Sequence, residues 1–414
     1  MLTLVVRRGE DVVYPYTTRL PLAEEERYPY LRALTQLLLW MVGGDSLSWI
    51  GEEDEFHRFV SQAEQDPELI PTIREMGHIF EHPFAFRTET IVPKAKALRI
   101  GASGSFSGCR IGIDLGGSDR KVTAVEDGKV VFSEETLWLP KEQTNWLYHY
   151  NGILDSFLKA KQHLPRVDAV GVSTAGVVLN NQFAQAALCF SIPLEVQNKQ
   201  VRDLFLTMQQ KEFPDASLLV ANDGDVTAFG GAMLFHKDHL LGLAMGTGEA
   251  AGYFADGHFN GWILELGKAP FRYDLEAHSH YAVNTRGAGT EYLSQKGILH
   301  LAEAAGYLYR GTLAEQLVAL QNDVAKGDPV LEECYREMGV YLADALTLYA
   351  HFLPLQSVLV LGRVTSGKGG DLMIQTANEL LQKGPHPIEV FTADESFKRL
   401  GQSYLADALP KCKV

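Results

Sequence analysis

An aspartate followed by a glycine turn is the first feature of this chain whose residue types could do chemistry. The segment reads Arg110-Ile-Gly-Ile-Asp114-Leu-Gly116-Gly117-Ser118 and continues through Lys121 into a second apolar stretch. It predicts a buried strand, a tight turn and a second strand. Outward-facing amides of a glycine turn bind phosphate oxygens. A nearby carboxylate suits Mg²⁺, which keeps several waters and takes one or two carboxylates together with phosphates. A plain β-hairpin is the alternative.

A second acid occurs at the end of another expected strand. Leu218–Ala221 leads directly into Asn222 and Asp223, and a helix is expected from Asp225 to Phe235. A carboxylate at this position could accept the proton of an alcohol that attacks a phosphoryl group. The alternative is that Asn222 or Asp223 only caps the helix, which both residue types do well.

A second glycine turn lies at Gly246-Thr247-Gly248, between expected strands at Leu240–Met245 and Ala250–Phe254. It could hold the β- and γ-phosphates of a nucleotide opposite the Asp114 turn. As a simple hairpin it would need no ligand.

The elements that position these residues alternate between strands and helices, which is the pattern of an α/β fold. The first series has expected strands at Arg110–Asp114, Val122–Glu126, Val130–Ser133, Ala169–Ser173 and Leu218–Ala221, with helices at Leu147–Lys161 and Asp225–Phe235. The second series adds strands at Val358–Leu361 and Ile388–Phe391, and helices at Glu291–Tyr309, Pro329–Phe352, Leu372–Gln382 and Phe397–Leu409. Because each series opens with a strand–glycine turn–strand unit, we expect a duplicated domain with a cleft between its two lobes.

The segment before residue 109 is expected to form a separate α+β unit. A hairpin is predicted from Leu2–Val6 and Val12–Tyr16, with helices at Arg27–Val42, Asp54–Ala63 and Pro67–Phe80, and the Gly/Ser-rich residues 101–108 are predicted to be a mobile boundary. Residues 1–108 contain 11 Lys and Arg against 16 Asp and Glu, a net charge of -5, which fits a DNA-binding unit poorly. Docking, oligomerisation or a lid are more plausible roles.

Composition is that of an ordinary soluble globular protein, with 46% hydrophobic and 21% charged residues. The net charge of -15 argues against nucleic acid as a partner. No apolar run is long enough for a membrane span, and the N-terminus lacks the features of a signal peptide. The four cysteines show no paired spacing. We therefore expect a cytoplasmic protein with no nucleic-acid or membrane partner, and a homodimer is possible.

Taken together, these motifs resemble those of the ROK family (repressors, uncharacterised reading frames and sugar kinases) in the actin–hexokinase–Hsp70 superfamily. The resemblance spans about Cys109 to the C-terminus. Asp114 to Ser118 resembles the family's D-x-G-G-T motif, Gly171 to Val178 its G-[IV]-x-x-P-G-P-[IV] turn without the prolines, and Asn222-Asp223 its N-D-A-N motif. Gly246 to Gly248 resembles its second phosphate motif, Glu265-Leu266-Gly267 its sugar-contacting E-[IL]-G, and Leu359 to Gly362 with Gly367 its adenosine motif.

The resemblance implies a two-lobed actin-like ATPase fold, related to ribonuclease H, with an interlobe cleft. It divides the chain into residues 1–108, a first lobe at 109–235 together with a C-terminal helix at 396–414, and a second lobe at 236–395. It implies an ATP-dependent kinase of a sugar or polyol, with Mg·ATP in the cleft and Asp223 as catalytic base. The implied nucleotide-binding residues are Asp114 (also holding Mg²⁺ through water), Gly116, Gly117, Ser118, Lys121, Gly246, Thr247, Gly248, Gly362 and Gly367. The implied substrate-binding residues are Ser173, Asn222, Glu265 and Glu291.

Departures from the family pattern concentrate in the substrate shell. Lys268 stands where the family has a histidine, and the cysteine-rich zinc motif is absent, so no structural zinc is expected. Glu291 stands in for the family's second sugar-binding glutamate, one position out of register. The altered shell keeps an alternative open, in which the protein senses a sugar or nucleotide without catalysis. A third possibility is an ATPase that hydrolyses ATP with no acceptor.

Three other motifs predict different chemistry and are disfavoured. Gly362 to Gly369 nearly fits a P-loop but lacks its hydroxyl residue, because Gly369 takes that position. His78, Glu81 and His82 fit an inverted zinc-protease pattern, yet Pro83 follows at once. His278 and His280 are more consistent with a solvated loop than with a metal site.

Overall fold

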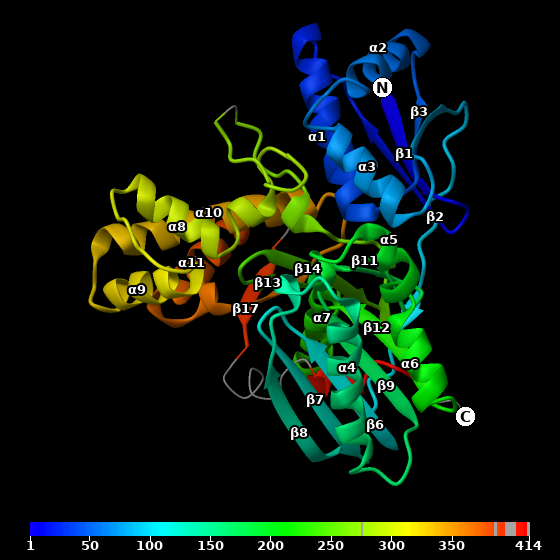
Figure 1. Cartoon of the computed structure of the whole chain (residues 1–414). Helices are drawn as coiled ribbons and strands as arrows, with labels where there is room; N and C mark the ends of the chain where they lie inside the picture. Colours follow the sequence, from blue (N-terminus) through cyan, green and yellow to red (C-terminus); the bar gives the residue numbers. More distant parts are fainter. Residues whose placement is uncertain (275, 385–386, 394–402, 412–414) are drawn as a thin grey trace. The chain divides into compact units, whose positions relative to one another are not determined.

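The computed structural model describes residues 1–274, 276–384, 387–393 and 403–411 (Figure 1). The chain forms two compact units. The first unit contains Met1–Arg99, Leu243–Ala251 and Asn260–Thr392. The second contains Ile100–Gly242, Gly252–Phe259 and Ala393–Val414. Each unit is described by itself below.

The second unit is built on a five-stranded sheet of order β12-β9-β6-β7-β8. Its strands are β6 (Cys109–Leu115), β7 (Asp119–Glu126), β8 (Lys129–Leu137), β9 (Ala169–Thr174) and β12 (Ser217–Asn222). Strands β12, β9 and β6 run parallel, and β6, β7 and β8 run antiparallel. The unit also holds a hairpin of β10 (Val177–Leu179) and β11 (Gln182–Gln185), and the helices α4 (Trp146–Lys161), α5 (Leu194–Val196), α6 (Leu204–Glu212) and α7 (Asp223–Phe235). Short 3-10 turns lie at Pro140–Glu142 and Ala187–Cys189, and a π-helical turn lies at Gln197–Val201.

The two faces of this sheet are covered differently because successive side chains of a strand alternate between faces. Ile111, Ile113, Val170 and Val172 belong to one buried core together with Ile153 and Phe157 of α4 (Figure 1). On the other face, Gly112 of β6 and Gly171 of β9 are direct partners. A Cβ on Gly171 would lie 1.7 Å from the carbonyl oxygen of Ala406. The paired glycines therefore make room for residues 403–411.

The C-terminal residues are anchored there by buried polar contacts. Thr123 donates to Asp407 Oδ2 at 2.7 Å, and Arg110 Nη1 donates to the carbonyls of Asp407 and Pro410 at 3.0 and 2.9 Å. Residues 403–407 are helical. The remainder of the expected helix at 396–414, namely 396–402 and 412–414, lies outside the described residues.

The first unit begins with a four-stranded sheet of order β2-β1-β3-β4. It consists of β1 (Leu2–Arg8), β2 (Val12–Thr18), β3 (Ser46–Ile50) and β4 (Ala85–Thr88), with the helices α1 (Glu24–Val42), α2 (Glu53–Ala63) and α3 (Ile70–Ile79). The predicted hairpin and the three predicted helices are confirmed. The last turns of α1 are wholly apolar and buried from Leu37 to Val42.

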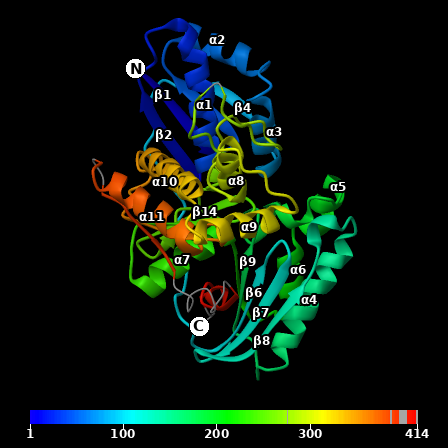
Figure 2. The ribbon, with the colours of Figure 1, turned by 90° about the vertical axis from the view of Figure 1, so that its left-hand side faces the viewer.

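The rest of the first unit is largely helical. Helices α8 (Gln295–Ala304), α9 (Leu313–Ala325), α10 (Pro329–Tyr349) and α11 (Gly367–Leu381) pack against one another (Figures 1 and 2). Short turns lie at Leu266–Lys268, Gly289–Glu291 and Arg363–Thr365. Among the described residues, no helix is long and apolar enough to cross a membrane.

A six-stranded sheet has the order β17-β16-β13-β14-β15-β5. Its strands are β5 (Ile100–Gly101), β13 (Leu240–Met245), β14 (Glu249–Ala255), β15 (His258–Phe259), β16 (Ser357–Leu361) and β17 (Glu389–Thr392). The chain passes from one unit to the other within β13 and within β14.

Some expected elements differ from those observed. The helix expected at Glu291–Tyr309 is wrong at both ends, because residues 289–291 form a 3-10 turn and α8 ends at Ala304. The Gly/Ser-rich residues 101–108 make backbone hydrogen bonds at their start. Ile100–Gly101 pairs with β15, and the amides of Ser103 and Gly104 donate to the carbonyls of Leu409 and Ala408.

Candidate active site

Three of the expected site residues lie side by side where strands of the second unit end. Asp114 of β6 is the direct partner of Ser173 on β9 and of Lys121 on β7. All three come from neighbouring strands because the parallel strands β6 and β9 end together and β7 returns after the glycine turn. Ser173 donates a hydrogen bond to the Asp114 carboxylate.

The surroundings of Asp114 shift the pKa of its carboxyl group in opposite directions. Burial raises the pKa of Asp114 to about 6, while the hydrogen bond from Ser173 and the charge of Lys121 lower it. Lys121 Nζ also lies 3.4 Å from Asp119 Oδ1. The result is a carboxyl group with a pKa of about 6 near the end of the central strand β6.

The turn after Asp114 is tight and open outward. The Gly116 amide donates to the Asp119 carbonyl at 2.9 Å, and Trp138 Nε1 donates to the Gly116 carbonyl at 2.8 Å. Gly117 and Ser118 are exposed, and a Cβ on Gly117 would meet nothing within 4 Å. This open backbone beside a carboxylate fits phosphate oxygens and a water-bound Mg²⁺.

Asn222 and Asp223 lie at the end of the adjacent strand, next to this group. Asn222 ends β12 as the partner of Thr174 on β9, and Asp223 begins α7. Asn222 Oδ1 accepts from the Gly224 amide at 2.7 Å, while its Nδ2 donates to the Gly176 carbonyl at 2.8 Å. Asn222 therefore does cap the helix. Asp223 Oδ1 also accepts from the Gly224 amide, at 3.1 Å, which orients the carboxylate at a helix N-terminus where negative charge is favoured.

Asp225 is a neighbouring acid that the sequence reasoning did not single out. Burial, reinforced by the charge of Asp223, raises the pKa of Asp225 to about 8, and a hydrogen bond from the Tyr253 amide lowers it. Asp225 therefore keeps its proton at neutral pH. The spacing of two acids around one glycine in Asn-Asp-Gly-Asp was the available signal.

The first unit carries the second glycine turn. Gly246 to Gly248 joins β13 to β14, with the Gly246 amide donating to the Gly248 carbonyl at 2.9 Å. Gly362, the residue after β16, lies against the carbonyl oxygen of Met245, where a Cβ would approach to 2.2 Å. Thr247 and Gly248 are exposed. Gly367 begins α11. The expected phosphate turn and the first glycine of the expected adenosine motif are thus neighbours.

Glu249, directly after this turn, was also missed. Within the part of the chain that the structure describes, neither of its carboxylate oxygens has a hydrogen-bond partner. Burial raises the pKa of Glu249 to about 8. Oε2 lies against Gly289, where a Cβ would come within 2.2 Å of it. The buried phenol of Tyr349 is near enough that the charge of Glu249 raises its pKa further, in addition to burial.

The two glutamates expected to bind substrate are each paired with a lysine. Lys268 Nζ lies 2.9 Å from Glu265 Oε2, and Lys296 Nζ lies 3.0 Å from Glu291 Oε1. Burial, followed by the charges of Lys268 and Lys296, lowers the pKa of His280 to about 4. Lys268 also lies over the Trp40 ring, 5.0 Å from its centre. Lys268, which stands where the ROK motif has a histidine, therefore forms an ion pair with Glu265 and also contacts Trp40 of α1.

That contact belongs to a backbone pairing. The amides of Ile263, Leu264 and Glu265 donate to the carbonyls of Val42, Met41 and Trp40 at 3.4, 3.0 and 2.9 Å. The apolar end of α1 thus covers the segment that bears Glu265.

The disfavoured motifs do not assemble in the structure. Helix α3 ends at Ile79, so His78 and His82 do not share a helical face. Lys368 of the P-loop-like segment pairs with Glu332 of α10. Among the described residues, Asp238, His239 and Asp256 are the acids and histidine that approach one another closely enough to ligate a metal, and both acids are exposed.

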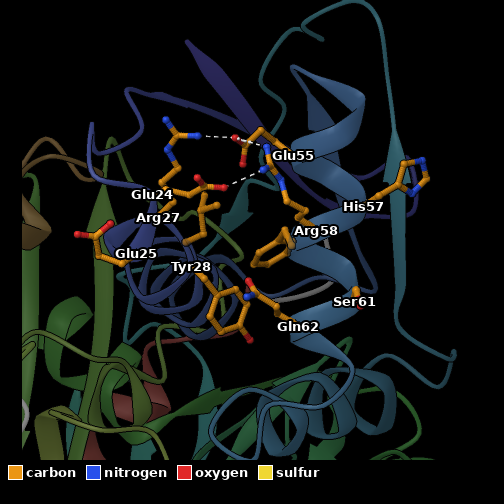
Figure 3. A pocket seen from close by; sticks show the side chains of 11 residues that line it. Glu24, Glu25, Arg27, Tyr28, Glu55, His57, Arg58, Ser61 and Gln62 are labelled. Atoms are coloured by element: carbon orange, nitrogen blue, oxygen red, sulfur yellow. Dashed lines mark hydrogen bonds and ion pairs between the residues drawn. The ribbon is translucent and has the colours of Figure 1, made fainter.

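A hollow of about 470 Å³ lies between α1 and α2 (Figure 3). Its charged side chains pair with one another: Arg27 with Glu55, and Arg58 with Glu24 and Glu55. These pairs join the two helices, and the hollow adds nothing to the site described above.

No protein-family model and no curated protein matches the sequence. Solved structures do match. A ROK family glucokinase from Streptomyces griseus, in complex with glucose and AMPPNP, is 18% identical with a TM-score of 0.54, and the match covers 73% of this chain and 98% of that one. A ROK hexokinase from Thermus thermophilus is 14% identical with a TM-score of 0.56, covering 73% and 98%.

The fold is that of the ROK sugar kinases. A ROK family transcriptional regulator, described as a homologue of the E. coli MLC protein, shares it at 15% identity and a TM-score of 0.53, covering 72% of this chain and 78% of that one. The expected actin-like α/β fold is confirmed. Since the ROK fold is common to kinases and to a regulator, activity has to be argued from the residues themselves.

Proposed function

We propose that this protein is an ATP-dependent kinase that phosphorylates a hydroxyl group of a sugar or sugar-like polyol. The observation that carries the proposal is the row formed by Asp114, Ser173 and Lys121, with Asn222 and Asp223 at the end of the next strand. An acid beside an open glycine turn can hold Mg²⁺ near phosphates, and a second acid at a helix N-terminus can accept the proton of an attacking alcohol.

In this proposal Asp223 accepts the proton of the attacking hydroxyl. Its carboxylate is oriented by the Gly224 amide, and Asn222 is fixed by the Gly176 carbonyl so that it can bind a neighbouring hydroxyl. Because Asp225 holds its own proton, Asp223 is the acid of this pair that is available as a base.

The turns at Gly116–Ser118 and Gly246–Gly248 would bind phosphate oxygens through backbone amides, and Asp114 would hold Mg²⁺ through water. When bound, Mg²⁺ supplies positive charge that neutralises the phosphates. Lys121 faces Asp114 and adds further positive charge. Gly362 and Gly367 remain the proposed contacts for the adenosine.

A second candidate is a sugar- or nucleotide-sensing protein without catalysis. It is favoured by the ion pairs of Glu265 with Lys268 and of Glu291 with Lys296, since each lysine competes with a sugar hydroxyl for its carboxylate. The regulator with the same fold makes this a serious alternative.

A coupled ADP-release assay separates these possibilities. The full chain is incubated with Mg·ATP alone and then with a panel of hexoses, amino sugars and polyols. We expect ADP release that depends on one class of acceptor. ADP release without acceptor would indicate an ATPase, and sugar binding without ADP release would indicate the sensing protein.

A further inference from the structure

A cavity of about 720 Å³ lies within the first unit, and none of the residues assigned above to catalysis or substrate binding lines it. One wall is the face of α1, and the others are the segment around Arg272 and the last turn of α10 with Phe352. This volume is in the range of small-molecule sites, about 300–1,000 Å³. Because its walls come from both residues 1–99 and residues 260–392, a ligand there would contact both segments.

Aromatic rings form the apolar part of the lining. Tyr16 stacks on Phe352 with ring centres 5.0 Å apart and an angle of 26°. Tyr273 also lines the cavity and is 55% exposed. Tyr16, Tyr30 and Tyr273 each bring a phenol hydroxyl, a group that can both donate and accept hydrogen bonds.

Arginines form the polar part, and their charges are balanced. Arg32 lies 3.5 Å from Asp66 and 3.3 Å from Glu68, Arg286 pairs with the same Glu68, and Arg272 pairs with Asp274 at 2.7 Å. The remaining charged residue of the lining, Glu26, is exposed. The walls thus present paired charges, which favours an uncharged ligand over an anion.

A guanidinium has five donors, so one carboxylate partner leaves further N–H groups for a ligand. Arg272 uses its Nε and Nη2 atoms for Asp274 and keeps 29% of its side-chain surface exposed. Ring faces together with hydroxyl and guanidinium donors match a molecule that has C–H faces and many hydroxyl oxygens. Sugars and cyclitols have this chemistry.

We propose that this cavity is a second binding site, for an uncharged polyhydroxylated ring of sugar size. Binding there does not depend on phosphoryl transfer, so the proposal goes beyond the kinase function and stands or falls separately from it. The ligand bridges the N-terminal segment and the body across the contacts that already join them, such as Asn284 Nδ2 to the Pro67 carbonyl at 3.1 Å.

The test is calorimetric titration of the full chain without ATP, with D-glucose, N-acetyl-D-mannosamine, sucrose and myo-inositol as probes. Ala33 lies on the cavity face of α1, and Ala33→Leu fills the space without lowering helix propensity. The matched control is Ala304→Leu, at an exposed position of α8. We expect at least one probe to bind the parent and the control equally, and to lose one site or at least tenfold in affinity in Ala33→Leu.

A second variant protects the test against a folding defect. Tyr273→Ala removes a largely exposed ring and is expected to weaken the same binding, while hydrogen exchange of residues 24–42 slows on adding the probe to the parent. Asp223→Asn is expected to keep this binding even if it abolishes phosphorylation, which separates the two proposals. Equal binding by the parent and both cavity variants, or no binding of any of the four probes, would overturn the proposal.

Discussion

Three buried or half-buried carboxyls show how position, rather than residue type, sets the chemistry of this chain. Burial raises the pKa of Asp114, Asp225 and Glu249 to about 6, 8 and 8. Only Asp114 has a cation and a hydroxyl directed at it from adjacent strands. Glu249 has no hydrogen-bond partner among the described residues, so its protonation is governed by burial alone.

Glu249 gives a pH-dependent prediction for stability. Its folded pKa of about 8 lies above the ordinary value of 4.5, so the folded state holds a proton that the unfolded state releases between these values. Its contribution to stability is therefore complete below about pH 4.5 and is lost as the pH rises towards 8. The slope is at most about 1.4 kcal/mol per pH unit.

Glu249→Gln should remove this dependence, because glutamine has nearly the same shape and does not titrate. Denaturant unfolding at pH 5 and pH 8 is expected to show the variant gaining stability relative to the parent at the higher pH. Glu303→Gln, at an exposed position of α8, is the control and should follow the parent. A constant difference between Glu249→Gln and the parent across this range would contradict the assignment.

The Lys268–Glu265 pair gives a second residue-scale prediction. Both side chains are 16% exposed, so removing one partner leaves a poorly solvated charge. Lys268→Met and Glu265→Gln should each destabilise the protein, and the double variant should recover part of the loss. We expect a coupling free energy of about 1–2 kcal/mol from equilibrium unfolding. Strict additivity of the two single effects would show that the pair contributes nothing.

At the scale of elements, the strands of the second unit are adapted to the C-terminal residues. Gly171→Ala places a methyl group where the Ala406 carbonyl now lies, 1.7 Å away. We expect a loss of about 1–3 kcal/mol, as for overpacked cores, and faster proteolysis of the C-terminal segment. Gly384→Ala, whose nearest atom would be 3.3 Å away, is the control. An unchanged melting temperature for Gly171→Ala would argue against this packing.

Elements with a strong local signal were predictable from the sequence, and those fixed by distant contacts were not. The hairpin around Gly9 and helix α4 followed from apolar periodicity and turn residues. Strand β4 is held by pairing to β3, about 40 residues earlier in the chain, and no local pattern reveals that. Helix α9 was missed although Thr312 and Glu315 form a capping box, a signal the sequence does contain.

The site residues also differ in whether the local sequence could predict their positions. Asp114 and Asp223 each come at the end of an apolar strand, so their positions at the carboxyl ends of the strands could be predicted. Lys268 pairs with Glu265 only three residues away, but its position over Trp40 depends on two segments more than 200 residues apart. Sequence reasoning therefore identified Lys268 as a departure from the family without showing what it contacts.

At the scale of the whole molecule, residues 1–99 are part of the first unit. The end of α1 in this segment covers residues 263–265 through backbone hydrogen bonds. Removing residues 1–99 leaves the amides of Leu264 and Glu265 without their partners and exposes the surface that the apolar end of α1 covers. We expect the shortened protein to lose solubility and to bind a hydrophobic dye. A soluble, monodisperse truncated protein with unchanged activity would show that the segment is dispensable.

The central claim is that Asp223 accepts the proton of a sugar hydroxyl during phosphoryl transfer. It is tested most directly by single-turnover phosphorylation at saturating Mg·ATP, with the acceptor that the ADP-release panel identifies. Asp223→Asn should lower the rate by about 10²–10⁴-fold with little change in ATP binding. Asp225→Asn, which replaces an acid that already holds its proton, should stay within a few-fold of the parent. A near-normal rate for Asp223→Asn would contradict the account.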